Sequence, residues 1–456
     1  MNQLGGLFSC TRIPGESRDQ LVRHFKTESE GPCATHIVVF SNGHIFLLRP
    51  IDDKDRLMPA QEIYRQLCQV KKLSTTRGQG MGVLTADDRP SFAKAYKHLC
   101  ALDPVNRSHL DLIEKSVFTL MLDNGTPKTP SEYMEQTIKG DVFCRWAEKS
   151  YGIVAFSNGI ITVNGDHAPV DGMVIVVLNK IIHDHLLQTA GGWPTSEYTR
   201  FSNYQPPKEL VFTVDETILK AMEKAFDIYS ANAANLLVLS SRCGAYGKKW
   251  TKKYKLHPDT VFQLALQHAY YTLHHKPVAT YETATTRQFY HGRTETLRTC
   301  TSEVVQWCQA MADPSVSMPE RRALLLAAVK KHDENMSDAA NAEGCDRHLF
   351  GLQIMAMEQG LPVPELYTDP AYTKSGGGGH FTLSTSCAGY SGSLGAVAPM
   401  CNDGYGAFYS IADNNYFPCL LTFKSSKETN LKQFFVALNA SLVDIQNLVM
   451  MNNSKM

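Results

Sequence analysis

The sequence lacks three features that would each point to a class of protein. It contains 12 cysteines but no Cys-x-x-Cys pair and no His/Cys group at zinc spacing, so no metal site is expected. It has no apolar run near the roughly 20 residues that span a bilayer, and no membrane span is therefore predicted. Lys+Arg and Asp+Glu are both 45. This balance gives no indication of a nucleic-acid or membrane surface.

A secretory leader is also missing, so we expect the cysteines to be reduced thiols in an intracellular compartment. We find no internal repeat of solenoid period and no low-complexity segment beyond four glycines at 376–379. What is present is a globular composition over 456 residues, 43% hydrophobic and 20% charged. This length predicts two domains. A segment of glycines, prolines and polar residues near 191–208 divides the chain into 1–209 and 210–456.

The most informative motif follows two predicted hairpins. Ser-Asn-Gly occurs at 41–43 and again at 157–159, each time between β-rich apolar runs, and Asn-Gly tolerates the positive φ of a tight turn. His167 lies just beyond the second hairpin, and Asp171 follows after three small residues. Neutral imidazole is the usual protein base near pH 7, with an unperturbed pKa of about 6.5. The motif indicates a catalytic base at the rim of a sheet, and an ordinary surface loop is the alternative.

The remaining pattern is helical. An apolar stretch at 173–187 predicts a buried helix. After His-Pro-Asp at 257–259, apolar positions recur on one helix face together with His268, which we expect to be a core histidine. Residues 431–445 predict an amphipathic C-terminal helix.

Four further clusters carry polar groups suited to chemistry. Five lysines lie within 248–255, before a helix start, where they would neutralise phosphates. Tyr-Glu-Thr at 281–283 and Gly-Arg-Thr-Glu-Thr at 292–296 supply hydroxyls and a guanidinium, and Arg347 begins an apolar helix. Ser-Thr-Ser at 384–386 would donate to an oxyanion. Each cluster also has a structural interpretation, as a solvated basic loop, a helix-end charge, a helix cap or a flexible loop.

The order of these motifs along nearly the whole chain resembles the choline/carnitine acyltransferase family. Gly-Arg-Thr-Glu-Thr together with Arg347 is typical of the carnitine enzymes rather than the choline enzymes. Residues 25–31, 257–260 and 375–379 look most like the peroxisomal, medium-chain members. The resemblance implies an α/β fold of two chloramphenicol-acetyltransferase-like domains, each a mixed sheet flanked by helices, with an active-site tunnel at their interface.

The resemblance also implies direct acyl transfer without an acyl-enzyme. His167 would be the general base for the 3-hydroxyl of carnitine, or for the thiol of coenzyme A in reverse. Asp171 would pair with Arg293 to hold the loop, and Ser386 would stabilise the oxyanion. The other implied contacts are Lys248, Lys252 and Asp259 for coenzyme A, Tyr281, Thr283, Thr294, Arg347 and Ser384 for carnitine, and Gly395 and Cys387 for the acyl chain.

The acyl-chain preference follows from two of these positions. Gly395, expected on the strand that continues from Ser-Thr-Ser, matches a position where short-chain members carry methionine. Glycine would open space for several methylenes, each stabilised by about 0.8 kcal/mol on burial, which favours medium chains over acetyl. Cys387 stands where the acetyl-specific member has glutamine, and medium-chain members tend to be apolar there.

The C-terminal Ser454-Lys455-Met456 differs from the peroxisomal signal Ser-Lys-Leu by one apolar residue, which predicts a peroxisomal import receptor as partner. The small-molecule partners implied are acyl-CoA and carnitine, with coenzyme A as co-substrate, no permanently bound cofactor and a monomeric chain. The chain does not match the N-terminal segment of a typical member, so exposed apolar surface and a loosened domain interface are expected. Two alternatives therefore stay open: a truncated form that binds coenzyme A or a partner without catalysing, and an acyl-CoA-dependent acyltransferase with another acceptor.

Overall fold

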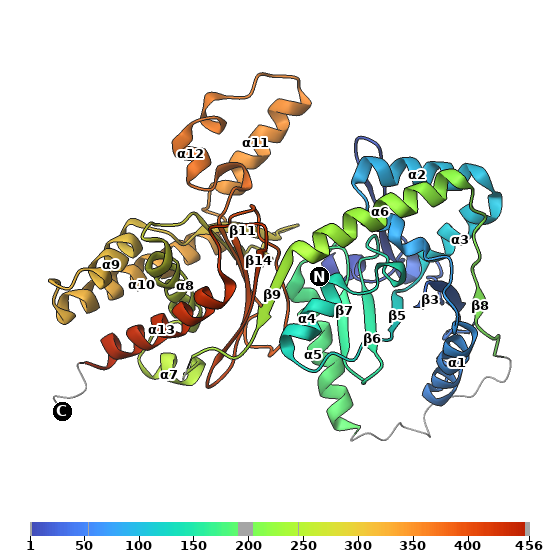
Figure 1. Cartoon of the computed structure of the whole chain (residues 1–456), viewed down its shortest axis with the longest axis horizontal. Helices are drawn as coiled ribbons and strands as arrows, with labels where there is room; N and C mark the ends of the chain where they lie inside the picture. The colour runs from blue at the N-terminus through green and yellow to red at the C-terminus, as the bar shows by residue number, and fades with distance from the viewer. Residues whose placement is uncertain (1, 53, 190–203, 245, 452–456) are drawn as a thin grey trace. The chain divides into compact units, whose positions relative to one another are not determined.

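The computed structural model describes residues 2–52, 54–189, 204–244 and 246–451 (Figure 1). The chain divides into two compact units, Met1–Ala234 (unit 1) and Asn235–Met456 (unit 2). The sequence placed the boundary at residue 209. In the structure, α6 (Glu216–Asn235) packs into the core of unit 1 through Ile218, Met222 and Ala225, and the domain boundary at residue 209 stays a prediction.

Unit 1 contains a six-stranded mixed sheet in the order β7-β6-β5-β3-β4-β8. Its strands are β3 (Ile37–Ser41), β4 (His44–Leu48), β5 (Thr119–Asp123), β6 (Gly152–Phe156), β7 (Ile161–Asn164) and β8 (Lys208–Glu209). The helices that accompany it, besides α6, are α1 (Ala60–Leu73), α2 (Arg89–Leu102), α3 (Pro104–Lys115), α4 (Pro130–Lys139) and α5 (Gly172–Gln188). A separate ribbon pairs β1 (Cys10–Ile13) with β2 (Gln20–Arg23), and four 3-10 turns complete the unit: η1 (Asn2–Gly6), η2 (Glu28–Glu30), η3 (Met81–Ala86) and η4 (Val142–Cys144).

Both predicted hairpins are confirmed. In the first, Ser41 pairs with His44, and the two turn residues Asn42 and Gly43 have φ of 49° and 81°. Positive φ at both positions matches the right-handed twist of the flanking strands. In the second, β6 and β7 pair around Ser-Asn-Gly, and Gly159 has φ of 83°. The segment that contains His167 therefore follows directly after β7.

Unit 2 contains a second six-stranded mixed sheet, in the order β11-β10-β12-β13-β14-β9. Its strands are β9 (Leu236–Ser240), β10 (Thr280–Thr285), β11 (Thr294–Arg298), β12 (Leu383–Cys387), β13 (Tyr405–Ile411) and β14 (Tyr416–Phe423). Its helices are α7 (Lys248–Lys253), α8 (Pro258–His274), α9 (Ser302–Ala312), α10 (Met318–Ala340), α11 (Asp346–Glu358), α12 (Pro370–Lys374) and α13 (Leu431–Met450), with the 3-10 turns η5 (Glu365–Tyr367) and η6 (Gly377–Gly379). The α/β architecture with mixed sheets is confirmed.

The two sheets share one pairing pattern. In unit 1 the central strands β6, β5 and β3 are parallel neighbours, β7 and β4 are antiparallel to the strands they flank, and β8 pairs antiparallel with β4. In unit 2 the same relations hold for β10, β12 and β13, flanked by β11 and β14, with β9 antiparallel to β14. The hairpin β6–β7 thus corresponds in position to the hairpin β10–β11.

The core of unit 2 lies between its sheet and helices α8, α10 and α13, which cover one face of the sheet (Figure 1). The predicted C-terminal helix is confirmed as α13, with Leu438, Leu442 and Ile445 buried. His268 is 7% exposed, and its Nδ1 lies 3.0 Å from Ser441 Oγ. Burial lowers the pKa of His268 to about 4, so it is a neutral core histidine, as the sequence predicted.

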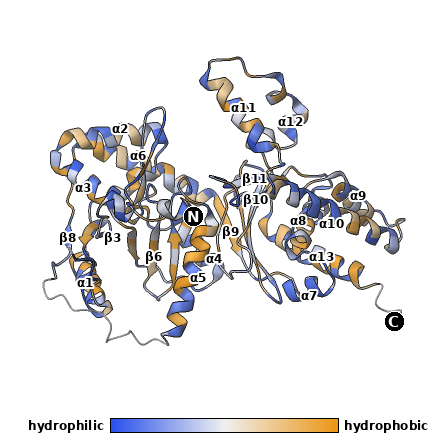
Figure 2. Ribbon diagram, turned by 180° about the vertical axis from the view of Figure 1, so that it is seen from behind, coloured by the Kyte–Doolittle hydropathy of each residue, from blue (hydrophilic) through white to orange (hydrophobic). Residues whose placement is uncertain are grey.

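The helix predicted at 173–187 is present as α5, but the prediction that it is buried is wrong. Within this helix Val174 and Val176 are buried, whereas Ile181 and Leu187 are 60% and 66% exposed. Apolar residues occupy more than one side of α5 (Figure 2), and packing against the rest of unit 1 covers one side. The exposed apolar surface expected from the sequence is therefore present on this helix.

No helix within the described residues is long and apolar enough to cross a membrane. The same part of the chain holds no cluster of three or more His, Cys, Asp or Glu side chains that would bind a metal ion. All twelve cysteines carry free thiols.

Candidate active site

One face of the unit 2 sheet gathers the hydroxyls that the sequence singled out. Burial alternates along β10, where Tyr281 and Thr283 are half-buried and Glu282 between them is buried. The register of β10 with β11 and β12 puts Thr294 and Ser384 on the face of Tyr281 and Thr283, because successive side chains of a strand point to opposite faces. Four of the predicted carnitine contacts therefore share one face.

The opposite face of the sheet packs against helices. Thr385, the middle residue of Ser-Thr-Ser, accepts a hydrogen bond of 2.9 Å from Gln263 of α8. Ser384 and Ser386, on either side of it, consequently face away from α8. Ser384 is buried and Ser386 is half-buried. The predicted oxyanion donor thus lies on the same face as the carnitine hydroxyls.

Arg347 completes this cluster. Its Nη2 donates to Tyr281 Oη at 3.1 Å and to Thr294 Oγ1 at 3.3 Å. Thr283 Oγ1 in turn donates to Tyr281 Oη at 3.2 Å. Arg347 is exposed, and an exposed guanidinium is a group that can bind a carboxylate through charge-assisted hydrogen bonds. We refer to Tyr281, Thr283, Thr294 and Arg347 as the arginine–hydroxyl cluster.

The start of α11 is fixed to β11, which explains how Arg347 reaches the hydroxyls. Arg298 of β11 donates to both carboxylate oxygens of Asp346, at 2.9 Å and 2.7 Å. The backbone N–H of Arg347 donates to Glu295 Oε1 at 3.2 Å. Gly344 permits this approach, since a Cβ there would lie 2.5 Å from Glu295 Cγ. Two neighbouring strands and one helix end therefore hold the cluster.

A buried acid–imidazole pair ties β10 to α10 behind the cluster. Glu282 Oε2 lies 2.9 Å from His332 Nε2, and each side chain is 1% exposed. Burial, together with Asp259, raises the pKa of Glu282 to about 8. Burial alone would lower the pKa of His332, but Glu282 and Asp333 raise it to about 10. Both groups bind protons more tightly in the folded protein than in free solution.

Asp259 occupies the interior rather than an open surface. It is 8% exposed, and Tyr409 Oη donates to its Oδ1 at 2.6 Å. Gln263 donates to the same Tyr409 hydroxyl at 2.8 Å, which links Asp259 through Tyr409 and Gln263 to Thr385. The residue predicted to contact coenzyme A is thus placed beneath the Ser-Thr-Ser strand.

Lys248 and Lys252 gather around an aromatic ring. Their Nζ atoms lie 4.9 Å and 5.8 Å from the ring centroid of Tyr390, which is 50% exposed. Lys248 also pairs with Asp413 at 3.0 Å. Two cations beside an exposed ring suit a ligand with phosphates and an aromatic base.

A cavity of about 680 Å³ lies beside the turn between α7 and α8, which separates the predicted coenzyme A contacts Lys252 and Asp259. Its basic groups come from Lys255, Arg322 and Lys330, and its acidic groups from Asp333 and Glu334.

Gly395 departs from the sequence prediction. It lies outside the strand, because β12 ends at Cys387 and the chain then turns through Gly389 and Gly392, with φ of 65° and 69°. A Cβ at Gly395 would meet the Phe408 ring at 2.5 Å, so this ring occupies the space beside the glycine. Burial, with Asp259 nearby, raises the pKa of the Cys387 thiol well above its usual value. Cys387 is therefore a neutral thiol, and the register of β12 with β13 sets it beside Tyr409, on the face opposite Ser386 and Phe408.

In unit 1 His167 lies on a bend between β7 and α5 and is exposed. Asp171, at the head of α5, is 7% exposed. Gln3 Nε2 donates to its Oδ2 at 2.6 Å, and the Asp171 N–H donates to Gln3 Oε1 at 2.9 Å. A carboxylate accepts several hydrogen bonds, so this contact is compatible with the predicted pairing of Asp171 with Arg293, which stays a prediction.

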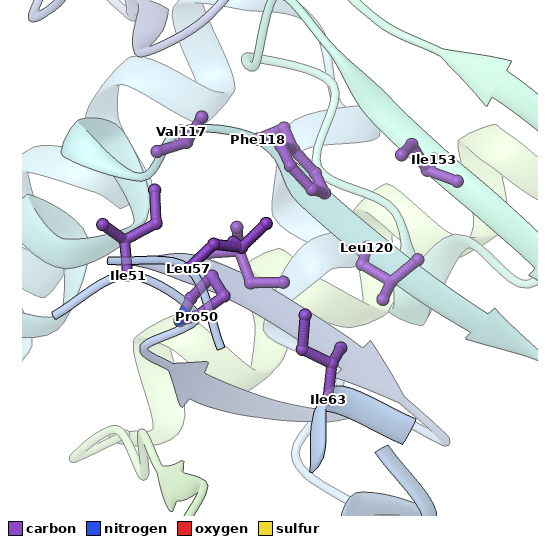
Figure 3. Close-up of a pocket in the computed structure, with 9 residues that line it drawn as sticks. Pro50, Ile51, Leu57, Ile63, Val117, Phe118, Leu120 and Ile153 are labelled. Atoms are coloured by element: carbon purple, nitrogen blue, oxygen red, sulfur yellow. The ribbon is translucent and has the colours of Figure 1, made fainter. Parts of the chain in front are cut away.

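A cavity of about 270 Å³ in unit 1 has a wholly apolar lining (Figure 3). None of the predicted site residues lines it. Its walls are Ile37, Pro50, Ile51, Leu57, Ile63, Val117, Phe118, Leu120 and Ile153.

Three residues next to predicted site positions were missed by the sequence analysis: Gln3, Tyr390 and Phe408. Their partners are Asp171, the lysines of α7 and Gly395, and each partner lies in a different element or loop. Pattern and propensity report neighbours within one element, so no sequence signal identified these contacts. Of the three, Tyr390 has the most unusual sequence context, because it is an aromatic residue in a turn rich in glycine.

Comparison with known proteins agrees with the motifs. The model of the choline/carnitine O-acyltransferase family matches residues 1–440. A peroxisomal carnitine O-octanoyltransferase from Bos taurus is 43% identical over 99% of this chain and 74% of its own length, and one from Homo sapiens is 44% identical over 95% and 71%. A carnitine O-acetyltransferase from Rattus norvegicus is 30% identical over 98% of this chain and 72% of its own. The chain therefore belongs to the choline/carnitine O-acyltransferase family.

Proposed function

We propose that the chain catalyses reversible transfer of a medium-chain acyl group between coenzyme A and the 3-hydroxyl of carnitine. The observation that carries this proposal is the arginine–hydroxyl cluster. In it an exposed guanidinium donates to the hydroxyls of Tyr281 and Thr294, and Thr283 donates to Tyr281. Carnitine has a carboxylate for Arg347, and choline has none. The octanoyltransferase relatives support the medium-chain preference.

His167 is the general base in this mechanism. Its imidazole removes the proton from the carnitine hydroxyl, and the resulting alkoxide attacks the thioester carbonyl of acyl-CoA. The tetrahedral intermediate collapses with loss of the coenzyme A thiolate, which takes the proton back from the imidazolium. Proton and acyl group are conserved in each direction, so no acyl-enzyme is required.

Ser386 donates a hydrogen bond to the oxyanion of that intermediate. Such a donor stabilises the transition state by about 3 kcal/mol. Tyr281, Thr283, Thr294, Arg347 and Ser384 bind carnitine. The position of the four hydroxyl residues on one sheet face, together with the hydrogen bonds from Arg347 to Tyr281 and Thr294, supports the assignment.

Lys248 and Lys252 bind the phosphates of coenzyme A, and Asp259 holds the strand beneath that cofactor's edge. Gly395 and Cys387 line the acyl chain. Asp171 pairs with Arg293 and holds the His167 loop. No permanently bound cofactor takes part.

The proposal extends to architecture and location. Each unit is built like chloramphenicol acetyltransferase, and the active-site tunnel lies at their interface. The chain acts as a monomer in the peroxisome, where an import receptor binds Ser454-Lys455-Met456. Those three residues lie outside the described part of the chain, and the support is the peroxisomal naming of the relatives. Deleting the tripeptide from a fluorescent fusion should release the protein from peroxisomes.

The direct test is thiol release from octanoyl-CoA by the purified chain. We expect release that depends on carnitine, is negligible with choline and is slower with acetyl-CoA. No release with carnitine, or equal release with choline, would contradict the proposal.

A binding protein without turnover is the second candidate, favoured by the exposure of His167 and of apolar residues on α5. Calorimetry that detects coenzyme A binding, combined with no transfer to carnitine, would support it. A different acceptor is distinguished by Arg347→Ala, which leaves the rate unchanged if that acceptor lacks a carboxylate.

A further inference from the structure

The side chain of Gln3 forms two hydrogen bonds with Asp171. Its amide nitrogen donates to the carboxylate at 2.6 Å, and its amide oxygen accepts from the Asp171 backbone N–H at 2.9 Å, although 168 positions separate the two residues. A planar amide that satisfies both groups fixes the position and the orientation of Asp171. This residue ends the bend that holds His167.

The segment that carries Gln3 is itself anchored. Ser150 Oγ donates to the carbonyl oxygens of Leu7 and Cys10 at 2.7 Å and 3.2 Å, and Leu7 is 1% exposed. Further along, Arg12 Nη2 lies 3.6 Å from Asp166 Oδ1. The segment thus contacts Asp166, just before His167, and Asp171, at the end of the bend. Contacts of Leu7, Cys10 and Arg12 therefore tie the segment that follows Gln3 to the rest of unit 1.

The N-terminal end of α5 lacks the usual side-chain cap. An aspartate at a helix N-cap usually accepts a hydrogen bond from an N–H group of the first turn. Asp171 is the N-cap of α5, yet its carboxylate makes no such capping bond. Its Oδ2 instead accepts from Gln3. The orientation of the carboxylate is therefore tied to the N-terminal segment.

We propose that Gln3 is a positioning residue that holds the His167 loop in its reactive geometry through Asp171. The proposal rests on the assignment of His167 as the general base. Removal of the Gln3 amide leaves a buried carboxylate without this donor, and the bend relaxes. A displacement of about 1 Å in a reacting group lowers the rate on the order of 100-fold. Substrate contacts in unit 2 are untouched.

Unit 1 offers a matched control. Gln79 makes the same two-point contact with another distant residue: its Nε2 donates to the Phe212 carbonyl at 2.7 Å, and its Oε1 accepts from the Phe212 N–H at 2.8 Å. Gln79→Ala therefore removes an equivalent pair of hydrogen bonds away from His167. It measures the general cost of losing such a pair.

The experiment compares Gln3→Ala, Gln3→Glu and Gln79→Ala with the wild type in octanoyl-CoA:carnitine transfer. We expect kcat to fall roughly 10- to 100-fold in Gln3→Ala, with both KM values unchanged. Gln3→Glu should lose at least as much, because it sets a second carboxylate against Asp171. Gln79→Ala should retain the wild-type kcat. Wild-type kcat in Gln3→Ala, or an equal loss in Gln79→Ala, would overturn the proposal.

Backbone hydrogen exchange provides a readout that is independent of turnover. Exchange at residues 165–172 should accelerate in Gln3→Ala and remain at the wild-type rate in Gln79→Ala. Equal exchange in all three proteins would overturn the positioning role. If the wild type transfers nothing, the proposed function fails, and the exchange rates still decide whether Gln3 holds the loop.

Discussion

The two units share a strand-pairing pattern but present their site residues in different ways. In unit 2 the hairpin β10–β11 carries Tyr281 and Thr294 on the strands themselves, and both accept hydrogen bonds from Arg347. In unit 1 the corresponding hairpin β6–β7 ends before the functional group, and His167 lies on the bend beyond it. One unit holds the proposed recognition site on paired strands, whereas the other holds the proposed base on a loop.

This difference teaches how the roles divide. A site on paired strands keeps its geometry when one side chain is removed. We therefore expect the loss of a side chain there to weaken substrate binding. A base on a bend depends on distant contacts, and its loss is felt in turnover. The predictions below separate the two units on this basis.

The largest effect is expected from His167→Ala. Without a general base, kcat should fall about 10²- to 10⁴-fold while the KM for carnitine stays near the wild-type value. Steady-state kinetics with octanoyl-CoA measure this. His183→Ala, which removes an exposed histidine of α5, is the control and should retain the wild-type kcat. A residual kcat close to wild type would remove His167 from the mechanism.

Ser386→Ala comes next. Loss of an oxyanion donor should lower kcat about 10²- to 10³-fold without weakening carnitine binding. Ser384→Ala, on the same strand face, should raise the KM for carnitine instead. The same kinetic effect in both variants would argue against separate roles for the two serines.

Arg347→Ala should act on binding. A hydrogen bond to a charged group contributes about 1.5–3 kcal/mol, which corresponds to a KM for carnitine raised about 10- to 100-fold, with the KM for octanoyl-CoA unchanged. Arg287 is an exposed arginine near the end of β10, and Arg287→Ala is the matched control. An unaltered KM for carnitine in Arg347→Ala would contradict the assignment of the arginine–hydroxyl cluster.

Gly395→Met tests the acyl chain. The added side chain must displace the Phe408 ring or enter the space beside it, and each buried methylene lost by the substrate is worth about 0.8 kcal/mol. We expect kcat/KM to fall about tenfold for octanoyl-CoA and to change little for acetyl-CoA. Equal losses for both substrates would indicate a disrupted fold rather than a shorter pocket.

The smallest effect concerns stability. The pKa values of Glu282 and His332 are raised to about 8 and about 10 in the folded protein, so folding favours their protonated forms. The contribution of each group is complete below its ordinary pKa, declines as the pH rises, and is gone once the pH passes the raised pKa. Between pH 7 and pH 10, the midpoint temperature of thermal unfolding should fall further in the wild type than in Glu282→Gln. Parallel losses in the two proteins would contradict this.

Sequence reasoning predicted the local features well. Asn-Gly at 42–43 gave the first hairpin, and the apolar period gave α13, because both depend on neighbouring residues. It failed where distant residues decide the outcome. The exposure of α5 and the turn of the chain before Gly395 depend on packing partners that no local pattern specifies.

The candidate site shows the same division. The motifs indicated Tyr281, Thr294 and Arg347 individually, and the structure brings them together. The contacts of Gln3 with Asp171 and of Glu282 with His332 could not be predicted, since each joins separate elements through single side chains.

Calorimetric titration of carnitine into the wild type, His167→Ala and Arg347→Ala tests the division of roles most directly. The account predicts that His167→Ala binds carnitine as tightly as the wild type, and that Arg347→Ala binds it about 10- to 100-fold more weakly. Weakened binding in His167→Ala with unchanged binding in Arg347→Ala would contradict it.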